Sequence, residues 1–182
     1  MDVEDPTELV RRGYDALSLR YDQAYGAETK YRPWISELSG RIPVGGTVLD
    51  LGCGSGVPVA RALATAGYRV TGVDISEVQI RRARELVPQA EFIRADAAAV
   101  DFAAASFDAI VSFYALIHIP LDEQLPLLRK IAQWLRPGDG SWASPAIGPG
   151  RVSMRTGWAM GLPCGGARRT PPRTGPGSPR PV

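Results

Sequence analysis

Apolar residues are spaced in two ways along this chain of 182 residues. Short apolar runs, typical of strands buried in a parallel sheet, occupy residues 48–51, 68–73, 91–94 and 107–113. Apolar residues at helical spacing predict helices over residues 7–24, 31–42, 57–66, 77–87 and 122–135. Because strands and helices alternate after residue 47, the pattern predicts an α/β fold. It is a Rossmann-like, doubly wound, mostly parallel sheet with helices on both faces.

The pattern divides the chain into three predicted segments: a helical lid or cap (1–46), a Rossmann-like core (47–144) and an irregular tail (145–182). Residues 140–182 hold 8 of the 16 prolines, six arginines and no acid, a composition typical of disorder. Residues 141–144 are expected to form a stub of a fifth strand, with the last strands of the sheet missing or degenerate. Two explanations stay open: a natural basic tail, or a shifted reading frame.

Composition excludes several classes of protein. The chain is 45% hydrophobic and 22% charged, with a net charge of +2. Acids outnumber bases in residues 1–139, so the body is not expected to bind nucleic acid. Two cysteines make neither a disulfide framework nor a zinc motif. With no signal peptide and no apolar run of about 18 residues, we expect a cytoplasmic protein that does not enter membranes.

The candidate chemistry begins in the stretch T-V-L-D-L-G-C-G-S-G, residues 47–56. Gly52, Gly54 and Gly56 follow the first strand and precede a helix, so a ligand can lie directly against the backbone at the positive end of that helix. Neither glycine frame matches the dinucleotide fingerprint G-x-G-x-x-G/A. Asp50 stands just before the glycines, where its carboxylate would repel a pyrophosphate but attract an amino group or a sulfonium.

Acids also end the next two predicted strands. Asp74 lies 22 residues after Gly52, close to the spacing of an acid that binds ribose hydroxyls. The alternative is a helix-entry acid, but Ser76 and Gln79 form a predicted capping box that frees Asp74 for binding. Asp96 follows the third strand, and it is either an acceptor for an exocyclic amine or a turn aspartate.

The segment Asp50-Leu-Gly52-Cys-Gly54-Ser-Gly56 resembles motif I of class I S-adenosylmethionine-dependent methyltransferases, and the resemblance extends over residues 10–138. It implies a small-molecule or quinone-biosynthesis-like branch that transfers a methyl group by in-line displacement. The implied cofactor is S-adenosylmethionine and the implied partner is a small-molecule acceptor. One alternative is a catalytically impaired cofactor-binding protein with a truncated or frame-shifted C-terminus. A less favoured one is an NAD-dependent dehydrogenase. The sequence gives no oligomeric state.

The resemblance also assigns residues. Tyr21, on a helix whose other phenol is Tyr14, would close over the methionine end of the cofactor, although simple packing of the helix is an alternative. His118, the sole histidine, follows the fourth strand and is the candidate catalytic base. A structural loop histidine is the alternative. Cofactor contacts are implied for Tyr21, Asp50, Gly52, Cys53, Gly54, Gly56, Asp74, Ile75, Asp96, Ala97 and Phe113. No metal site is expected.

Overall fold

The structure, a computed structural model, describes residues 5–25, 31–137, 141–144 and 152–154. Within these ranges the chain forms one sheet with the strand order β3-β2-β1-β4-β5-β6. The strands are β1 (Thr47–Leu51), β2 (Arg69–Asp74), β3 (Glu91–Arg94), β4 (Ala109–Val111), β5 (Ser141–Ser144) and β6 (Val152–Met154). The first five pair in parallel, and β6 runs antiparallel to β5. The predicted fold class is confirmed.

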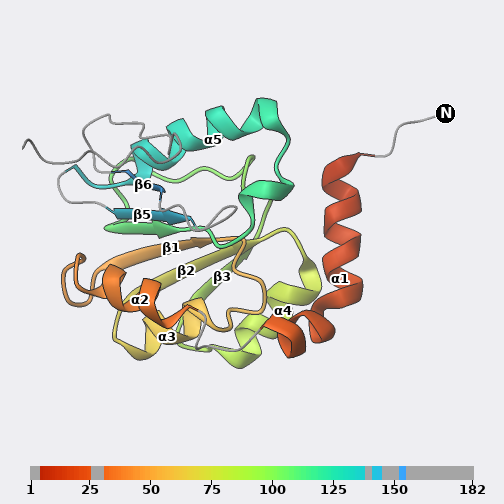
Figure 1. Cartoon of the computed structure of the whole chain (residues 1–182), viewed down its shortest axis with the longest axis horizontal. Helices are drawn as coiled ribbons and strands as arrows, with labels where there is room; N and C mark the ends of the chain where they lie inside the picture. The colour runs from red at the N-terminus through yellow and green to blue at the C-terminus, as the bar shows by residue number, and fades with distance from the viewer. Residues whose placement is uncertain (1–4, 26–30, 138–140, 145–151, 155–182) are drawn as a thin grey trace, which may run out of the picture.

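Helices cover both faces and one end of this sheet. They are α1 (Pro6–Tyr25), α2 (Arg32–Ser39), α3 (Val59–Thr65), α4 (Glu77–Leu86), the 3₁₀ turn η2 (Leu116–His118) and α5 (Leu121–Trp134). Figure 1 shows α5 on one face of the sheet and α2, α3 and α4 on the other. Within the described ranges, no helix is both long enough and apolar enough to cross a membrane.

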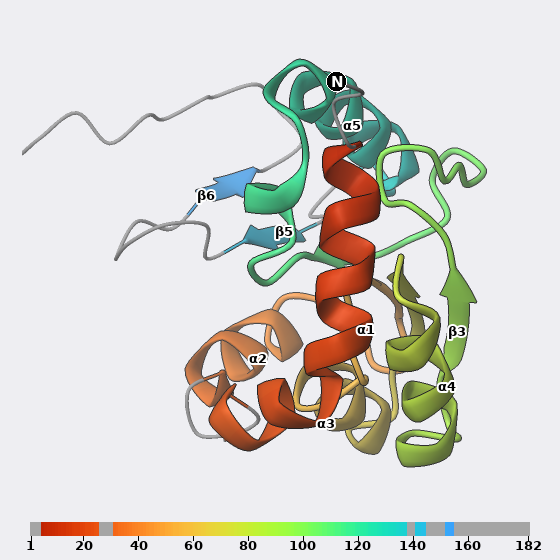
Figure 2. The same cartoon turned by 90° about the vertical axis from the view of Figure 1, so that its right-hand side faces the viewer.

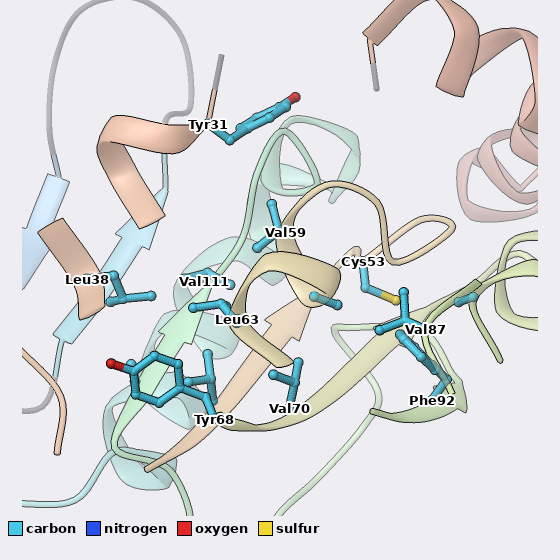
Figure 3. Close-up of a cluster of buried hydrophobic side chains, with 14 of the residues drawn as sticks. Tyr31, Leu38, Cys53, Val59, Leu63, Tyr68, Val70, Val87, Phe92 and Val111 are labelled. Carbon is cyan, nitrogen blue, oxygen red and sulfur yellow. The ribbon is translucent and has the colours of Figure 1, made fainter. Parts of the chain in front are cut away.

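Alternation along the strands divides the buried side chains into two cores. In β1, Val48 packs into the core beneath α3 and α4, while Leu49 and Leu51 face α5. Figure 3 shows the first core, in which Leu63 of α3 lies near Val70 of β2. Because β1 is buried on both faces, the carboxyl end of this strand is a rigid base for a site.

Helix α1 packs across the end of the sheet rather than on either face, as Figure 2 shows. Polar side chains attach it to α4. The Ser76 hydroxyl donates to Asp15 Oδ1 at 2.6 Å, and Arg82 donates to Asp22 Oδ2 at 2.6 Å. Between them, Ser18 Oγ donates to Gln79 Oε1 at 2.7 Å, and both of these side chains are buried. This row of contacts fixes α1 over the strand ends.

Two details of the predicted fold are wrong. The strand expected over residues 107–113 is regular only from Ala109 to Val111, and before it Phe107 makes an isolated bridge with Leu135. After Val111 the chain turns towards the site, and Tyr114 adopts a φ of 65°. Strand β5 pairs with β4 as predicted, but β6 lies in the segment expected to be irregular. The remainder of that tail lies outside the described residues.

Helix α5 carries apolar residues on more than one side. In the sequence, Leu125, Leu128, Ala132 and Leu135 recur at helical spacing on one side of this helix. In the structure Leu127, Ile131 and Trp134 are the buried residues of this helix. Of the expected stripe, Leu135 is buried and Leu128 packs against the same core, whereas Leu125 is 50% exposed. Tertiary packing, which the periodicity does not contain, decides which of these residues are buried.

Candidate active site at the strand ends

A cavity of about 110 Å³ opens at the carboxyl ends of β1 to β4. The sheet order changes direction between β1 and β4, and ligands of open α/β sheets bind at such a point. Helix α1 forms the outer wall with Val10, Tyr14 and Tyr21. Eight other predicted site residues line the cavity: Gly52, Gly54, Asp74, Ile75, Asp96, Ala97, Phe113 and His118.

A smaller recess of about 50 Å³ lies beside this cavity, and Tyr21 and Phe113 line both. Asp50 and Ser55 also line the recess, and both are buried. Asp50 Oδ2 and Ser55 Oγ have no hydrogen-bond partner within the described residues. Unsatisfied buried polar atoms are rare and costly, so two in one recess indicate the place of a polar ligand group.

The electrostatics of Asp50 point to a cation. Burial raises the pKa of Asp50 to about 7, and the nearby Asp74 carboxylate contributes to the rise. Burial also raises the pKa of Asp74, although the backbone N–H groups of Ser76 and Gly54 oppose this effect. A positively charged group between the two acids would favour the ionised form of both.

Asp74 is less free than the sequence suggested. Its Oδ1 accepts from the Ser76 N–H, and its Oδ2 accepts from the Gly54 N–H, each at 2.9 Å. The predicted capping box is half right. The Gln79 N–H donates to Ser76 Oγ, but the Gln79 side chain bonds Ser18 instead of closing the box. Each carboxylate oxygen of Asp74 keeps a second lone pair for a ligand in the cavity.

After the end of β3, Asp96 makes a local turn bond and also lines the cavity. Its Oδ1 accepts from the Ala98 N–H at 2.9 Å, which is the local bond of a turn aspartate. The side chain is nevertheless only partly buried, and both Asp96 and Ala97 line the cavity. The Asp96 carboxylate can therefore still accept from an amine.

The three loop glycines serve different purposes. Gly52 has a φ of 75°, and a Cβ there would clash with Ala115, so only glycine allows the loop to pack against the turn after β4. Gly54 has a φ of 56° and open space around it. Gly56 lines neither hollow, and its cofactor contact stays a prediction. A Cβ there would lie 3.0 Å from the Phe92 ring, so this glycine serves helix–strand packing.

Cys53 lies in the same loop, yet its side chain belongs to the core. The sulfur lies so close to Gly72 that a Cβ at that position would be 2.8 Å from Sγ. Cys53 also packs in one cluster with Val87 and Phe92 (Figure 3). Burial raises the pKa of the thiol, which keeps it protonated and unreactive. Because Cys53 lines the recess as well, it can contribute to a ligand site without acting as a nucleophile.

At the mouth of the cavity, Tyr14 of α1 meets His118 of η2. Tyr14 Oη lies 2.8 Å from His118 Nε2, and the two rings pack edge to face with centroids 5.4 Å apart. The Tyr21 ring packs against Tyr14 in the same manner at 5.6 Å. Partial burial lowers the pKa of His118, which favours a neutral imidazole that can accept a proton.

Sequence reasoning missed three residues of this region. Ser55 is an unsatisfied group of the recess, Tyr31 closes the recess by packing on Phe113 at 5.2 Å, and Gln124 contacts the turn that carries His118. Only Ser55 had a local signal, since it lies inside the glycine motif. Within the described ranges, no group of three or more His, Cys, Asp or Glu side chains is arranged to hold a metal.

Comparison with known proteins assigns the family. Residues 48–138, half of the chain, match a family described as a methyltransferase domain. The chain belongs to this family, and the motif resemblance to class I S-adenosylmethionine-dependent methyltransferases is confirmed.

Two curated relatives illustrate the similarity. The chain is 32% identical to 27-O-demethylrifamycin SV methyltransferase of Amycolatopsis mediterranei, over 73% of this chain and 56% of that protein. It is 37% identical to 2-methyl-6-phytyl-1,4-hydroquinone methyltransferase of Synechocystis, over 53% of this chain and 31% of that protein. The chain thus spans about half, or less, of the length of these relatives.

A solved structure agrees with the fold. Magnesium protoporphyrin IX methyltransferase from Synechocystis PCC 6803, crystallised with bound SAM, superposes with a TM-score of 0.68. The superposition covers 85% of this chain and 82% of that one, at 21% sequence identity. This likeness establishes a shared fold.

Proposed function

We propose that the chain binds S-adenosylmethionine and transfers its methyl group to a small-molecule acceptor. The observation that carries this proposal is the buried carboxylate of Asp50, which lacks a partner at Oδ2 in a recess joined to a cavity lined by Asp74 and Asp96. The order of these acids suits a ligand with a cationic end, a sugar diol and an adenine amine. A cytoplasmic location, and an acceptor other than nucleic acid, belong to the same proposal.

Each part of the ligand has a matching group. Asp50 and Ser55 would accept hydrogen bonds from the amino group at the methionine end. Asp74 would accept from the ribose hydroxyls, and Asp96 from the adenine amine, with the Ala97 N–H towards the ring. Gly52 and Gly54 leave room for the ligand against the backbone. Tyr21 and Phe113, which line both hollows, would enclose the ligand at the junction.

When bound, the cofactor supplies an electrophilic methyl group on a positively charged sulfur. The protein's contribution is then alignment and exclusion of water, because charge disperses during the transfer. Tyr14, Tyr21 and Phe113 make the wall that keeps this region dry. If the acceptor loses a proton, His118 accepts it at Nε2, in the place now taken by the Tyr14 hydroxyl or through that hydroxyl.

The relatives suggest which acceptors to try. One is named for 27-O-demethylrifamycin SV and another for 2-methyl-6-phytyl-1,4-hydroquinone. We propose an acceptor of this general kind. The dehydrogenase alternative is set aside by the family match, and no observation favours the catalytically impaired protein over the enzyme.

The test has two stages. Calorimetric titration with S-adenosylhomocysteine and with NAD⁺ is expected to give saturable binding of the first alone. Methyl-labelled S-adenosylmethionine is then incubated with a panel of quinols, phenols and hydroxylated polyketides, and label in the organic phase reports transfer. Binding without transfer to any acceptor would support the impaired protein. Binding of NAD⁺ in place of S-adenosylhomocysteine would overturn the proposal.

A further inference from the structure

His118 belongs to a short turn with little support of its own. The turn η2 spans only Leu116–His118, held by the His118 N–H donating to the Ala115 carbonyl at 3.0 Å and the Ile119 N–H donating to the Leu116 carbonyl at 3.2 Å. Pro120 then begins α5 without a side-chain cap. Short 3₁₀ turns have poorer hydrogen-bond geometry than α-helices, so the position of His118 depends on contacts from outside the turn.

One side chain of α5 supplies such contacts. Gln124 Nε2 donates to the Leu116 carbonyl at 3.2 Å and to the Ile119 carbonyl at 2.9 Å. These carbonyls lie on either side of His118 in the sequence, and a single amide nitrogen with two hydrogens bonds both. Gln124 is half-buried, so the two bonds are partly shielded from water.

We propose that Gln124 is the positioning residue for His118: its amide clamps the turn and thereby holds the imidazole against Tyr14. The catalytic meaning of this inference rests on the proposed function, but the clamp itself does not. When both ends of the turn are fixed, the His118 ring keeps a single position beside the Tyr14 hydroxyl at the cavity. A turn without the clamp would let the ring leave the Tyr14 hydroxyl and face the solvent.

The groups around His118 make this proposal measurable. Tyr14 approaches from α1, while Glu123 of α5 and Tyr114 of the loop line the same cavity. Burial favours the neutral ring, and so does the Tyr14 hydroxyl in the tautomer in which it donates to Nε2. Losing the clamp removes both influences, so the imidazole should become easier to protonate. Because His118 is the only histidine of the chain, its ring proton signal in an NMR titration is unambiguous.

The experiment compares the full wild-type chain with Gln124→Met, which keeps the size of the side chain and removes the two donors. Gln133→Met, at an exposed position on the same helix, is the matched control. We expect the His118 midpoint to rise in Gln124→Met, towards the ordinary value, because the ring becomes less buried. The Gln133→Met midpoint should equal that of the wild type. In turnover with any acceptor found, kcat should fall about tenfold with little change in cofactor KM.

Gln124→Asn provides a second variant should Gln124→Met not fold. It keeps the amide but withdraws it by one methylene, and it should raise the midpoint as well. A folded Gln124 variant that titrates like the wild type would overturn the clamp. S-adenosylhomocysteine affinity, measured on the same samples, separates the two claims. Absence of binding by the wild type would count against the proposed function, whereas the midpoint shift decides the clamp alone.

Discussion

Tyr14 Oη lies 2.8 Å from His118 Nε2, although 104 positions separate these residues in the sequence. The contact joins α1 to the turn before α5 and closes the cavity at its mouth. Helix α1 is thereby held at two places: by its polar contacts with α4 and by this bond. The cavity wall and the candidate base are therefore parts of one arrangement.

Replacing Tyr14 by Phe tests this relationship. The variant keeps the ring packing and removes the hydroxyl. In the tautomer in which the Tyr14 hydroxyl donates to Nε2, the hydroxyl favours the neutral imidazole, so its loss should raise the His118 pKa. Methyl transfer should fall about tenfold or more, while S-adenosylhomocysteine affinity changes little. Tyr68→Phe is the control, because the Tyr68 hydroxyl donates to the Ser39 carbonyl far from the site. Equal turnover in the two variants would contradict a role for the bond.

The buried Asp50 carboxylate is expected to lower the stability of the empty protein while it favours binding of the cofactor. Burial raises the pKa of Asp50 to about 7, so in the folded chain this carboxyl keeps its proton up to about pH 7. In the unfolded chain the same carboxyl loses its proton at about pH 4, as an exposed aspartate does. Stability of the empty protein should therefore fall as pH rises through this window and level off above it. Asp50→Asn removes the part of this dependence that Asp50 causes, while the part due to buried Asp74 remains. The melting temperature of the variant relative to the wild type should therefore be higher at pH 8 than at pH 4, by roughly 5 °C.

The same variant should bind S-adenosylmethionine at least about tenfold more weakly at pH 8, because the ionised carboxylate is lost. In the wild type, affinity should decline as pH falls through about 7, since protonated Asp50 no longer attracts the cationic end. Calorimetry over this pH range measures both effects. A wild-type affinity that is flat with pH would show that Asp50 does not face the ligand cation.

Two substitutions in the glycine loop separate the cost of a positive φ in a residue with a Cβ from the cost of a steric clash with Ala115. Gly52 and Gly54 both have a positive φ, but only a Cβ at Gly52 meets Ala115. Gly54→Ala should cost about 1–2 kcal/mol of unfolding free energy from strain alone. Gly52→Ala should cost that amount and about 1–3 kcal/mol more for the clash. Urea unfolding of the two variants checks this, and equal losses would contradict the packing described for Gly52.

Helix α5 provides a second pair. Leu127→Ala should lower the unfolding free energy by about 2–5 kcal/mol because Leu127 is buried. Leu125→Ala should change it by about 0.5 kcal/mol at most, because half of that side chain is exposed. Denaturant midpoints measure both. A larger loss of unfolding free energy in Leu125→Ala than in Leu127→Ala would show that Leu125 is the buried residue of the two.

These pairs show what the sequence could predict. The order of strand, glycine loop and helix was predictable, and so were the acids at the strand ends, because short local patterns determine them. The buried face of α5 was not, since Leu125 and Leu127 are equally apolar in sequence and only the fold distinguishes them. Contacts such as Tyr14 with His118 were also out of reach, because no local rule links residues so far apart.

The central claim is that acids at consecutive strand ends bind S-adenosylmethionine. Titration of the wild type, Asp74→Asn and Asp96→Asn with S-adenosylhomocysteine tests it most directly, with the exposed Asp122→Asn as control. We predict saturable binding by the wild type and by the control, and a loss of about tenfold or more in each of the other variants. Wild-type affinity in all four chains, or no binding in any, would contradict the account.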